Sequence, residues 1–123
     1  MKSLFLTIAL VLSSVCFSQT KVRITSVEIG RVVNDSMTKW SKTKPFSEDV
    51  EITEGEMLKF GETQFHLCER QPSNAEDIYI YKSVNLSNYQ DCVITYFNNC
   101  DGTMVIIIQY PKKEFYFQGV KEG

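Results

Sequence analysis

Apolar and polar residues alternate in short runs along most of this chain. Val22 and Ile24 alternate with polar neighbours, and the alternation resumes at Val27 after a change of phase. A period of two residues predicts strands, because successive side chains of a strand point to opposite faces. The change of phase at Thr25-Ser26 predicts a β-bulge, which inserts one extra residue into a strand.

Turn-forming residues separate these runs at intervals of about 8–12 residues, a spacing typical of antiparallel sandwiches and barrels. Asp101-Gly102 is a strong hairpin signal, because glycine adopts positive φ without steric cost. Residues 43–48, which include Pro45, and residues 71–76, which include Pro72, are expected to be loops. The expected strands lie near residues 22–29, 37–40, 50–52, 57–60, 65–67, 78–81, 92–97, 103–110 and 115–117.

The run Val105-Ile106-Ile107-Ile108 does not alternate, which predicts a strand buried on both faces. No window of eleven residues has the apolar stripe of a helix. The predicted fold is therefore all-β: a single antiparallel meander of eight or nine short strands forming a small barrel or sandwich, lipocalin-like in general shape. The short connections favour closure, because closure removes exposed strand edges.

Residues 1–18 are expected to form a secretory signal peptide. Lys2 supplies a positive start, Leu4 to Leu12 an apolar segment, and Cys16-Phe17-Ser18 a small-x-small cleavage site. The apolar segment is shorter than the roughly 20 residues that span a bilayer, so no membrane span is expected after cleavage. The predicted organisation is a signal peptide at 1–18 and a single all-β domain at 19–123, exported to the periplasm, the cell surface or the medium. Lipidation of Cys16 is the alternative, but Val15 stands where a lipoprotein signal has a small residue.

The charge pattern excludes some classes of partner. The chain has 13 Lys and Arg against 15 Asp and Glu, a net charge of −2, and loss of Lys2 with the signal would make it −3. Charges of both signs are interspersed without a Lys/Arg stripe, which argues against nucleic acid and against anionic membrane surfaces as partners.

Three cysteines would remain after cleavage: Cys68, Cys92 and Cys100. An odd number leaves at least one thiol unpaired. Cys92 and Cys100 lie too far apart along a predicted hairpin to form a disulfide, which needs Cα atoms about 4.4–6.8 Å apart. A Cys68–Cys92 disulfide requires neighbouring strands; otherwise three reduced thiols are expected, two of them buried.

Residues suited to catalysis or metal binding are scarce. His66 is the only histidine, and the chain has no Cys-x-x-Cys pair, no Gly-x-Ser-x-Gly motif and no glycine-rich phosphate loop. His66, Cys68 and Arg70 alternate on one predicted strand and form the sharpest catalytic hypothesis, but any strand produces such rows by chance. Glu54 and Glu56 fall in a predicted turn, where solvated carboxylates are expected. We therefore expect no enzyme activity, no cofactor and no bound metal.

Five aromatic residues on or beside predicted strands form a candidate ligand face: Trp40, Tyr79, Tyr81, Tyr96 and Tyr110. Their rings offer flat apolar surface and their polar groups offer hydrogen bonds, as a small apolar or carbohydrate ligand would need. The alternative is that they form cross-strand pairs and fill a small core. The interior of an eight-stranded barrel is just wide enough for side chains or one small ligand.

The tripeptide Asp35-Ser36-Met37 is similar to a short O-glycosylation signal of some bacteria. It falls in a predicted turn, where an acceptor hydroxyl would be accessible. Ser36 is therefore a candidate modified residue.

The chain resembles a family of small exported bacterial proteins of unknown function. The shared elements are a signal ending in Phe-Ser-Gln, an early tryptophan, a cysteine strand, a glycine turn and a strand ending in tyrosine. Here they are Phe17-Ser18-Gln19, Trp40, Asp91-Cys92-Val93-Ile94, Asp101-Gly102 and Ile106-Ile107-Ile108-Gln109-Tyr110. The resemblance implies a compact β domain and brings no activity, ligand or partner.

These observations lead to three functional hypotheses. We expect a non-catalytic binding or interaction module of the periplasm or cell surface, whose partner is a small apolar or carbohydrate ligand or another exported protein. The alternative is a small secreted inhibitor or immunity-type protein that acts on another protein through the loops at 71–76 or 98–102. The third hypothesis is a thiol-dependent hydrolase that uses Cys68 or Cys92.

Overall fold

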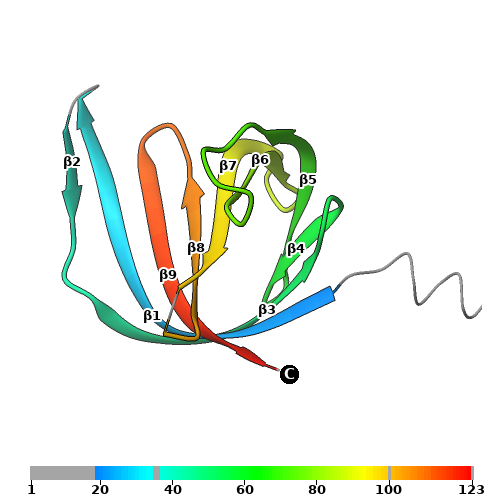
Figure 1. Cartoon of the computed structure of the whole chain (residues 1–123). Helices are drawn as coiled ribbons and strands as arrows, with labels where there is room; N and C mark the ends of the chain where they lie inside the picture. The colour runs from blue at the N-terminus through cyan, green and yellow to red at the C-terminus, as the bar shows by residue number, and fades with distance from the viewer. Residues whose placement is uncertain (1–18, 35–36, 100, 123) are drawn as a thin grey trace, which may run out of the picture.

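The computed structural model describes residues 19–34, 37–99 and 101–122, and every regular element in these ranges is a strand. The predicted all-β class is therefore confirmed, and the described residues form no helix that could cross a membrane. The strands are β1 (Gln19–Asn34), β2 (Met37–Trp40), β3 (Lys44–Thr53), β4 (Met57–Phe60), β5 (Thr63–Gln71), β6 (Tyr79–Asn85), β7 (Gln90–Asn98), β8 (Thr103–Gln109) and β9 (Lys113–Glu122) (Figure 1).

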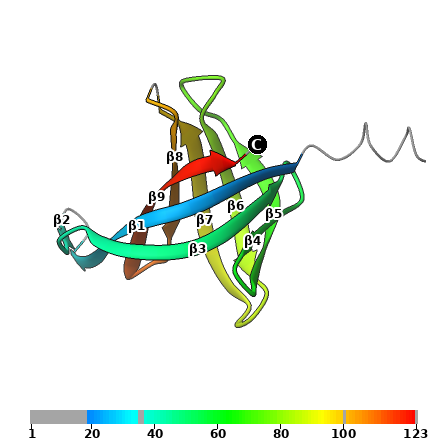
Figure 2. The ribbon, with the colours of Figure 1, turned by 90° about the horizontal axis from the view of Figure 1, so that it is seen from below.

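The strands form one antiparallel sheet that closes into a barrel. Each strand from β3 to β8 pairs with the next one in sequence, and β1 pairs with both β3 and β9. This pairing closes an eight-stranded barrel and decides between the predicted barrel and sandwich. The ninth strand, β2, pairs with the second half of β1 and lies outside the barrel. Figures 1 and 2 show β2 and the far end of β1 projecting beyond the other strands.

The bulge predicted in the first strand is confirmed. The register of β1 shifts between Ile24 and Ser26, against β3 on one side and against β9 on the other. The extra residue allows Val22, Ile24 and Val27 all to point into the barrel despite the change of phase.

The predicted loop at 43–48 is wrong for most of its length, because β3 begins at Lys44. Lys44 and Pro45 pair with Val27 and Ser26 of β1. Proline lacks the N–H group that a sheet uses, but Pro45 lies beside the bulge of β1, where the hydrogen-bond ladder is already interrupted. Pairing with a strand distant in sequence thus overrides the local loop signal. For the same reason, β9 extends well beyond the predicted residues 115–117.

Side chains from the inward faces of the strands fill the barrel. The buried core consists of Val22, Ile24, Val27, Val50, Ile52, Leu58, Phe65, Leu67, Tyr81, Cys92, Ile94, Tyr96, Met104, Ile106, Ile108 and Phe117. On the outward face of β8, Val105 is fully buried and Ile107 is only half-buried. The predicted burial of β8 on both faces is therefore right for Val105 and too strong for Ile107.

Aromatic rings lie toward both ends of the barrel interior. We call one end the tyrosine end: it holds Tyr79, Tyr81 and Tyr96, near the turn at 54–56 and the loop at 72–78.

The opposite end, near the turns at 61–62 and 110–112, is the phenylalanine end, which holds Phe46, Phe60, Phe115 and Phe117. The ring centroids of Phe60 and Phe117 lie 4.5 Å apart, and those of Phe115 and Phe117 lie 5.9 Å apart. Phe46 lies 6.1 Å from Phe60, and its side chain is partly exposed. This cluster closes the barrel at the phenylalanine end with apolar surface.

Candidate functional site

Three of the five predicted aromatic residues meet inside the barrel. Tyr79 of β6 is the direct cross-strand partner of Tyr96 on β7, and their ring centroids lie 5.0 Å apart at an interplanar angle of 16°. Tyr81 lies 6.1 Å from the Tyr96 ring at 13°. The three rings therefore stack on one another, as cross-strand aromatic pairs do.

The hydroxyl group of Tyr96 is buried without a partner. Among the described residues, its Oη is the buried side-chain polar atom that makes no hydrogen bond. Burial, followed by the nearby Tyr81 and Glu54, raises the pKa of Tyr96 well above its ordinary value, so the hydroxyl keeps its proton. An unpaired buried hydroxyl costs about 1–3 kcal/mol.

Tyr96 lines a pocket of about 180 Å³ at the tyrosine end. This volume equals that of roughly six waters at about 30 Å³ each. It is below the range of about 300–1,000 Å³ that is typical for drug-sized ligands. The pocket therefore fits a small molecule or one end group of a larger one. Its lining consists of Thr20, Ile52, Glu54, Tyr79, Tyr96, Phe97, Asn98, Met104 and Lys121.

Arg70 borders the tyrosine group, which corrects the catalytic hypothesis. The register of β5 shifts between Leu67 and Glu69, so Cys68 occupies a second bulge. After this bulge, Arg70 lies opposite Tyr81 on the inward face, and its guanidinium carbon lies 4.7 Å from the centre of the Tyr79 ring. His66, Cys68 and Arg70 therefore do not share one face, because the extra residue reverses the alternation.

Tyr110 lies at the phenylalanine end, away from the other tyrosines. Its hydroxyl accepts a hydrogen bond of 3.0 Å from Nδ2 of the buried Asn85, and its ring meets Phe115 edge to face at 6.2 Å. The structure therefore does not bring Tyr110 together with Tyr79, because β8 ends at the opposite end of the barrel from the start of β6.

Trp40 also lies apart from Tyr79, Tyr81 and Tyr96. It pairs with Gly30 on the part of β1 that projects from the barrel, and its side chain is 45% exposed. The indole lies over the bare backbone of Gly30, where a β-carbon would be 3.0 Å from two of its ring carbons. Trp40 therefore covers the projecting hairpin rather than a ligand pocket.

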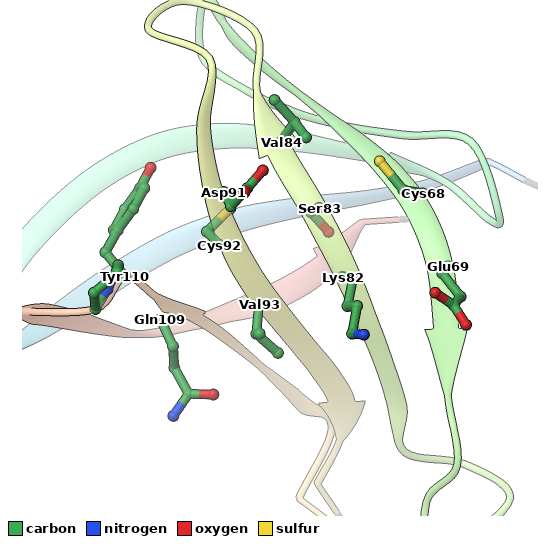
Figure 3. Close-up of a pocket in the computed structure, with 11 residues that line it drawn as sticks. Cys68, Glu69, Lys82, Ser83, Val84, Asp91, Cys92, Val93, Gln109 and Tyr110 are labelled. Carbon is green, nitrogen blue, oxygen red and sulfur yellow. The ribbon is translucent and has the colours of Figure 1, made fainter. Parts of the chain in front are cut away.

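A larger hollow of about 650 Å³ lies on the wall of the barrel (Figure 3). Glu69, Lys82, Val93 and Gln109 form a row across four neighbouring strands along it. Its lining mixes carboxylates, one ammonium group, an amide and aliphatic side chains, without a buried polar atom that lacks a partner. The geometry of this hollow therefore points to no particular ligand chemistry.

The cysteines in this region are free. Cys68 is exposed and Cys92 is buried. Strand β6 separates their strands, a distance of about 9.6 Å, so the conditional Cys68–Cys92 disulfide does not form. Burial, together with the charges of Asp91 and Cys68, raises the pKa of Cys92 to about 11. A nucleophilic thiol needs the opposite shift.

The remaining candidate residues are His66, the possible metal ligands and the residues outside the described ranges. His66 points outward, as its alternation with the buried Phe65 and Leu67 predicts. The described residues hold no group of three or more His, Cys, Asp or Glu side chains suited to a metal ion. Ser36, Cys100 and the signal segment 1–18 lie outside the described residues.

Sequence reasoning missed the charged residues around the tyrosine pocket. Glu54 is the exposed turn residue that the sequence predicted, but its place beside the pocket was not expected, and Lys121 lies beyond the last predicted strand. Both line the pocket because the closing pair β1–β9 brings the end of the chain beside the end of β3. No local pattern carries that information, because it depends on closure of the barrel.

Comparison of the chain with protein-family models, with curated proteins and with solved structures finds no match. The fold and the site therefore define the class of this protein: a small closed antiparallel β-barrel with a polar-lined pocket at one end. The resemblance to small exported bacterial proteins stays a prediction.

Proposed function

We propose that this protein is a non-catalytic binding module that holds a small molecule in the pocket at the tyrosine end. The observation that carries this proposal is that Tyr96, whose buried hydroxyl has no hydrogen-bond partner, lines a pocket of about 180 Å³. Buried polar groups are almost always hydrogen-bonded, so an exception in a residue that lines a pocket suggests that the missing partner is a ligand.

The lining of the pocket narrows the chemistry of this ligand. Ile52 and Met104 provide apolar contacts, whereas Glu54 and Lys121 place one charge of each sign among the lining residues. The ring faces of Tyr79 and Tyr96 are stacked on each other, so a flat sugar face has less ring surface to stack on than the sequence suggested. The lining favours a small neutral or zwitterionic molecule with a hydrogen-bonding group for Tyr96.

The proposal extends to an exported protein, on the strength of the predicted signal segment alone. Intact mass measurement of the protein recovered from the producing cells tests this part. A mass that corresponds to residues 19–123 supports cleavage and export, and retention of residues 1–18 contradicts them.

Saturation-transfer NMR with a library of fragments on the order of ten non-hydrogen atoms tests the binding site. Tyr96→Phe removes the hydroxyl and preserves the ring, and is expected to weaken binding of the best fragment about five- to tenfold. Tyr89→Phe is the matched control, because Tyr89 is 80% exposed and lies outside the pocket. Equal binding to the two variants, or no fragment that contacts the Tyr79 and Tyr96 rings, would overturn the proposal.

A further inference from the structure

Three cations face one another across the sheet where β1 leaves the barrel. Arg31 of β1 lies directly opposite Lys39 of β2 on one side and directly opposite Lys113 of β9 on the other. Directly opposite residues of antiparallel strands share one face, with Cβ atoms about 4.5–5.5 Å apart. We call Lys113, Arg31 and Lys39 the cation row.

The cation row continues the inward face of the barrel beyond the phenylalanine end. Ile29 and Phe115, two residues from Arg31 and Lys113, are also directly opposite each other, and both pack against the core. The ammonium group of Lys113 lies 5.2 Å from the centre of the Phe115 ring. The charges therefore border the aromatic end of the barrel interior.

Carboxylates lie on the other face of these strands. Glu28 accepts a hydrogen bond of 2.6 Å from Oγ1 of Thr43, and Glu114 accepts one of 3.3 Å from Nε2 of Gln109. Both alternate with the residues of the cation row, so they point away from it. The ion pair found in the described ranges, Arg23 with Asp49 at 2.8 Å, involves none of the three cations.

Like charges directly opposite each other destabilise a sheet. Three neighbouring cations without a counter-charge therefore lower the stability of the fold. A feature that lowers stability without a structural benefit is expected where it serves a function. The missing counter-charge is the first indication of an anionic ligand.

A hollow of about 610 Å³ shares Lys113 with the cation row and is the second indication. Lys112, Lys113, Phe115 and Tyr110 line it on one side, and the amides of Asn88 and Gln90 line it on the other. None of its lining residues is acidic. Its volume falls within the range of about 300–1,000 Å³ typical of small-molecule sites. Cationic and amide donors around aromatic surface suit a molecule that is anionic at one end and apolar at the other.

We propose that the phenylalanine end binds an anionic amphiphile, a molecule with a carboxylate, sulfate or phosphate headgroup on an apolar chain or ring. The headgroup binds between Lys113 and Arg31, with Lys39 adding charge, and the apolar part packs against Phe115 and Tyr110 in the hollow. This site lies at the opposite end of the barrel from the Tyr96 pocket, and the two share no lining residue, so either proposal can be wrong without affecting the other. The row is solvent-exposed, so affinity falls as salt is added.

Isothermal titration calorimetry with dodecyl phosphate, below its micelle-forming concentration and at low salt, tests the site. The double variant Arg31→Gln/Lys39→Gln is expected to bind at least about tenfold more weakly than the unaltered protein. The matched control Lys21→Gln/Lys59→Gln makes the same change of charge at exposed positions of β1 and β4 and is expected to stay within about twofold. Equal losses in the two double variants would reduce the effect to net charge and overturn the proposal.

Two further measurements keep the test independent of folding. Without ligand, Arg31→Gln/Lys39→Gln is expected to unfold at the same or a higher temperature, because a like-charge pair has been removed. In NMR spectra, dodecyl phosphate is expected to shift Gln90, Lys113 and Phe115 more than Tyr79 and Tyr96. Shifts centred on the tyrosine end would contradict the proposal.

The source of the amphiphile is resolved by comparing probes. Inorganic phosphate and dodecanol are each expected to bind far more weakly than dodecyl phosphate, and equal binding of either one would overturn the requirement for both parts. Vesicles of phosphatidylglycerol, compared with phosphatidylcholine vesicles, test a bilayer lipid as the source. Sedimentation with phosphatidylglycerol vesicles that needs Arg31 and Lys39 supports a lipid, and its absence, with dodecyl phosphate still bound, supports a free amphiphile.

Discussion

Gly119 of β9 lies so close to the backbone of Arg23 on β1 that a β-carbon at position 119 would clash with the Arg23 carbonyl oxygen. This contact lies at the bulge of β1, on the pair of strands that closes the barrel. Only glycine fits there without a movement of the main chain, because a carbonyl group in a sheet cannot rotate away as a side chain can.

Gly119→Ala is therefore expected to destabilise the protein by about 2–4 kcal/mol, since the strands that close the barrel must move apart. Gly30→Ala is the control, because the atoms nearest to its β-carbon would be side-chain atoms of Thr38 and Trp40 on the projecting hairpin, not backbone. Urea unfolding measured by circular dichroism gives both free energies. A loss at Gly119 no larger than that at Gly30 would contradict the account of the closing contact.

Tyr96→Phe is expected to stabilise the ligand-free protein by about 1 kcal/mol, because it removes a buried hydroxyl group that has no hydrogen-bond partner. The same variant is expected to bind the pocket ligand more weakly, so stability and binding should change in opposite directions. Thermal and urea unfolding of the protein freed of small molecules measure the first effect. A destabilised Tyr96→Phe variant would show that the hydroxyl already has a partner.

Alkaline pH is expected to destabilise the fold through Cys92. Its pKa rises from 9.0 to about 11 on folding, chiefly by burial. Because the unfolded thiol ionises first, the stability is intact below pH 9 and falls by on the order of 1–2 kcal/mol as the pH approaches 11. Urea midpoints of the unaltered protein and of Cys92→Ala test this. The variant is expected to lose less between about pH 8 and about pH 11, and identical losses would exclude Cys92 as the cause.

The two described thiols are expected to differ in reactivity. Cys68 is exposed at a bulge, whereas Cys92 is 5% exposed and its pKa is raised to about 11. Iodoacetamide at neutral pH should modify Cys68 in the folded protein and Cys92 only after unfolding. Peptide mapping by mass spectrometry distinguishes the sites, and rapid native modification of Cys92 would favour the thiol-hydrolase hypothesis.

The two bulges show what local pattern can and cannot predict. In β1 the inserted residue lies between two pairs of aliphatic residues, Val22 with Ile24 and Val27 with Ile29, so the change of phase is visible in the sequence. In β5 the inserted residue is Cys68, and the residues after it, Glu69, Arg70 and Gln71, are all polar. Because these residues are all polar, their sequence does not show which of them face inward. The bulge that turns Arg70 toward Tyr79 therefore becomes visible only in the pairing of β5 with β6.

The charges of the phenylalanine end were hidden for a similar reason. Lys113 is far in sequence from Arg31 and Lys39, and all three have acidic residues among their neighbours, so the chain as a whole looks evenly mixed. Register assigns each side chain to a face, and it gathers the cations on one face and Glu28 and Glu114 on the other. The net charge of the chain therefore does not reveal this cationic face.

The sequence by itself determined the all-β class, the positions of most strands, the first bulge and the glycine turn at Gly102, where φ is 86° in the structure. These follow from alternation and turn chemistry, which act between residues close along the chain. Only the tertiary structure decided that the sheet closes as a barrel, that Tyr79, Tyr81 and Tyr96 meet while Trp40 and Tyr110 lie elsewhere, and that Glu54 and Lys121 line one pocket. Each of these features depends on which strands pair and in what register. The pairing of β1 with β9 places the first strand of the domain beside the last one, and no local sequence pattern predicts that contact.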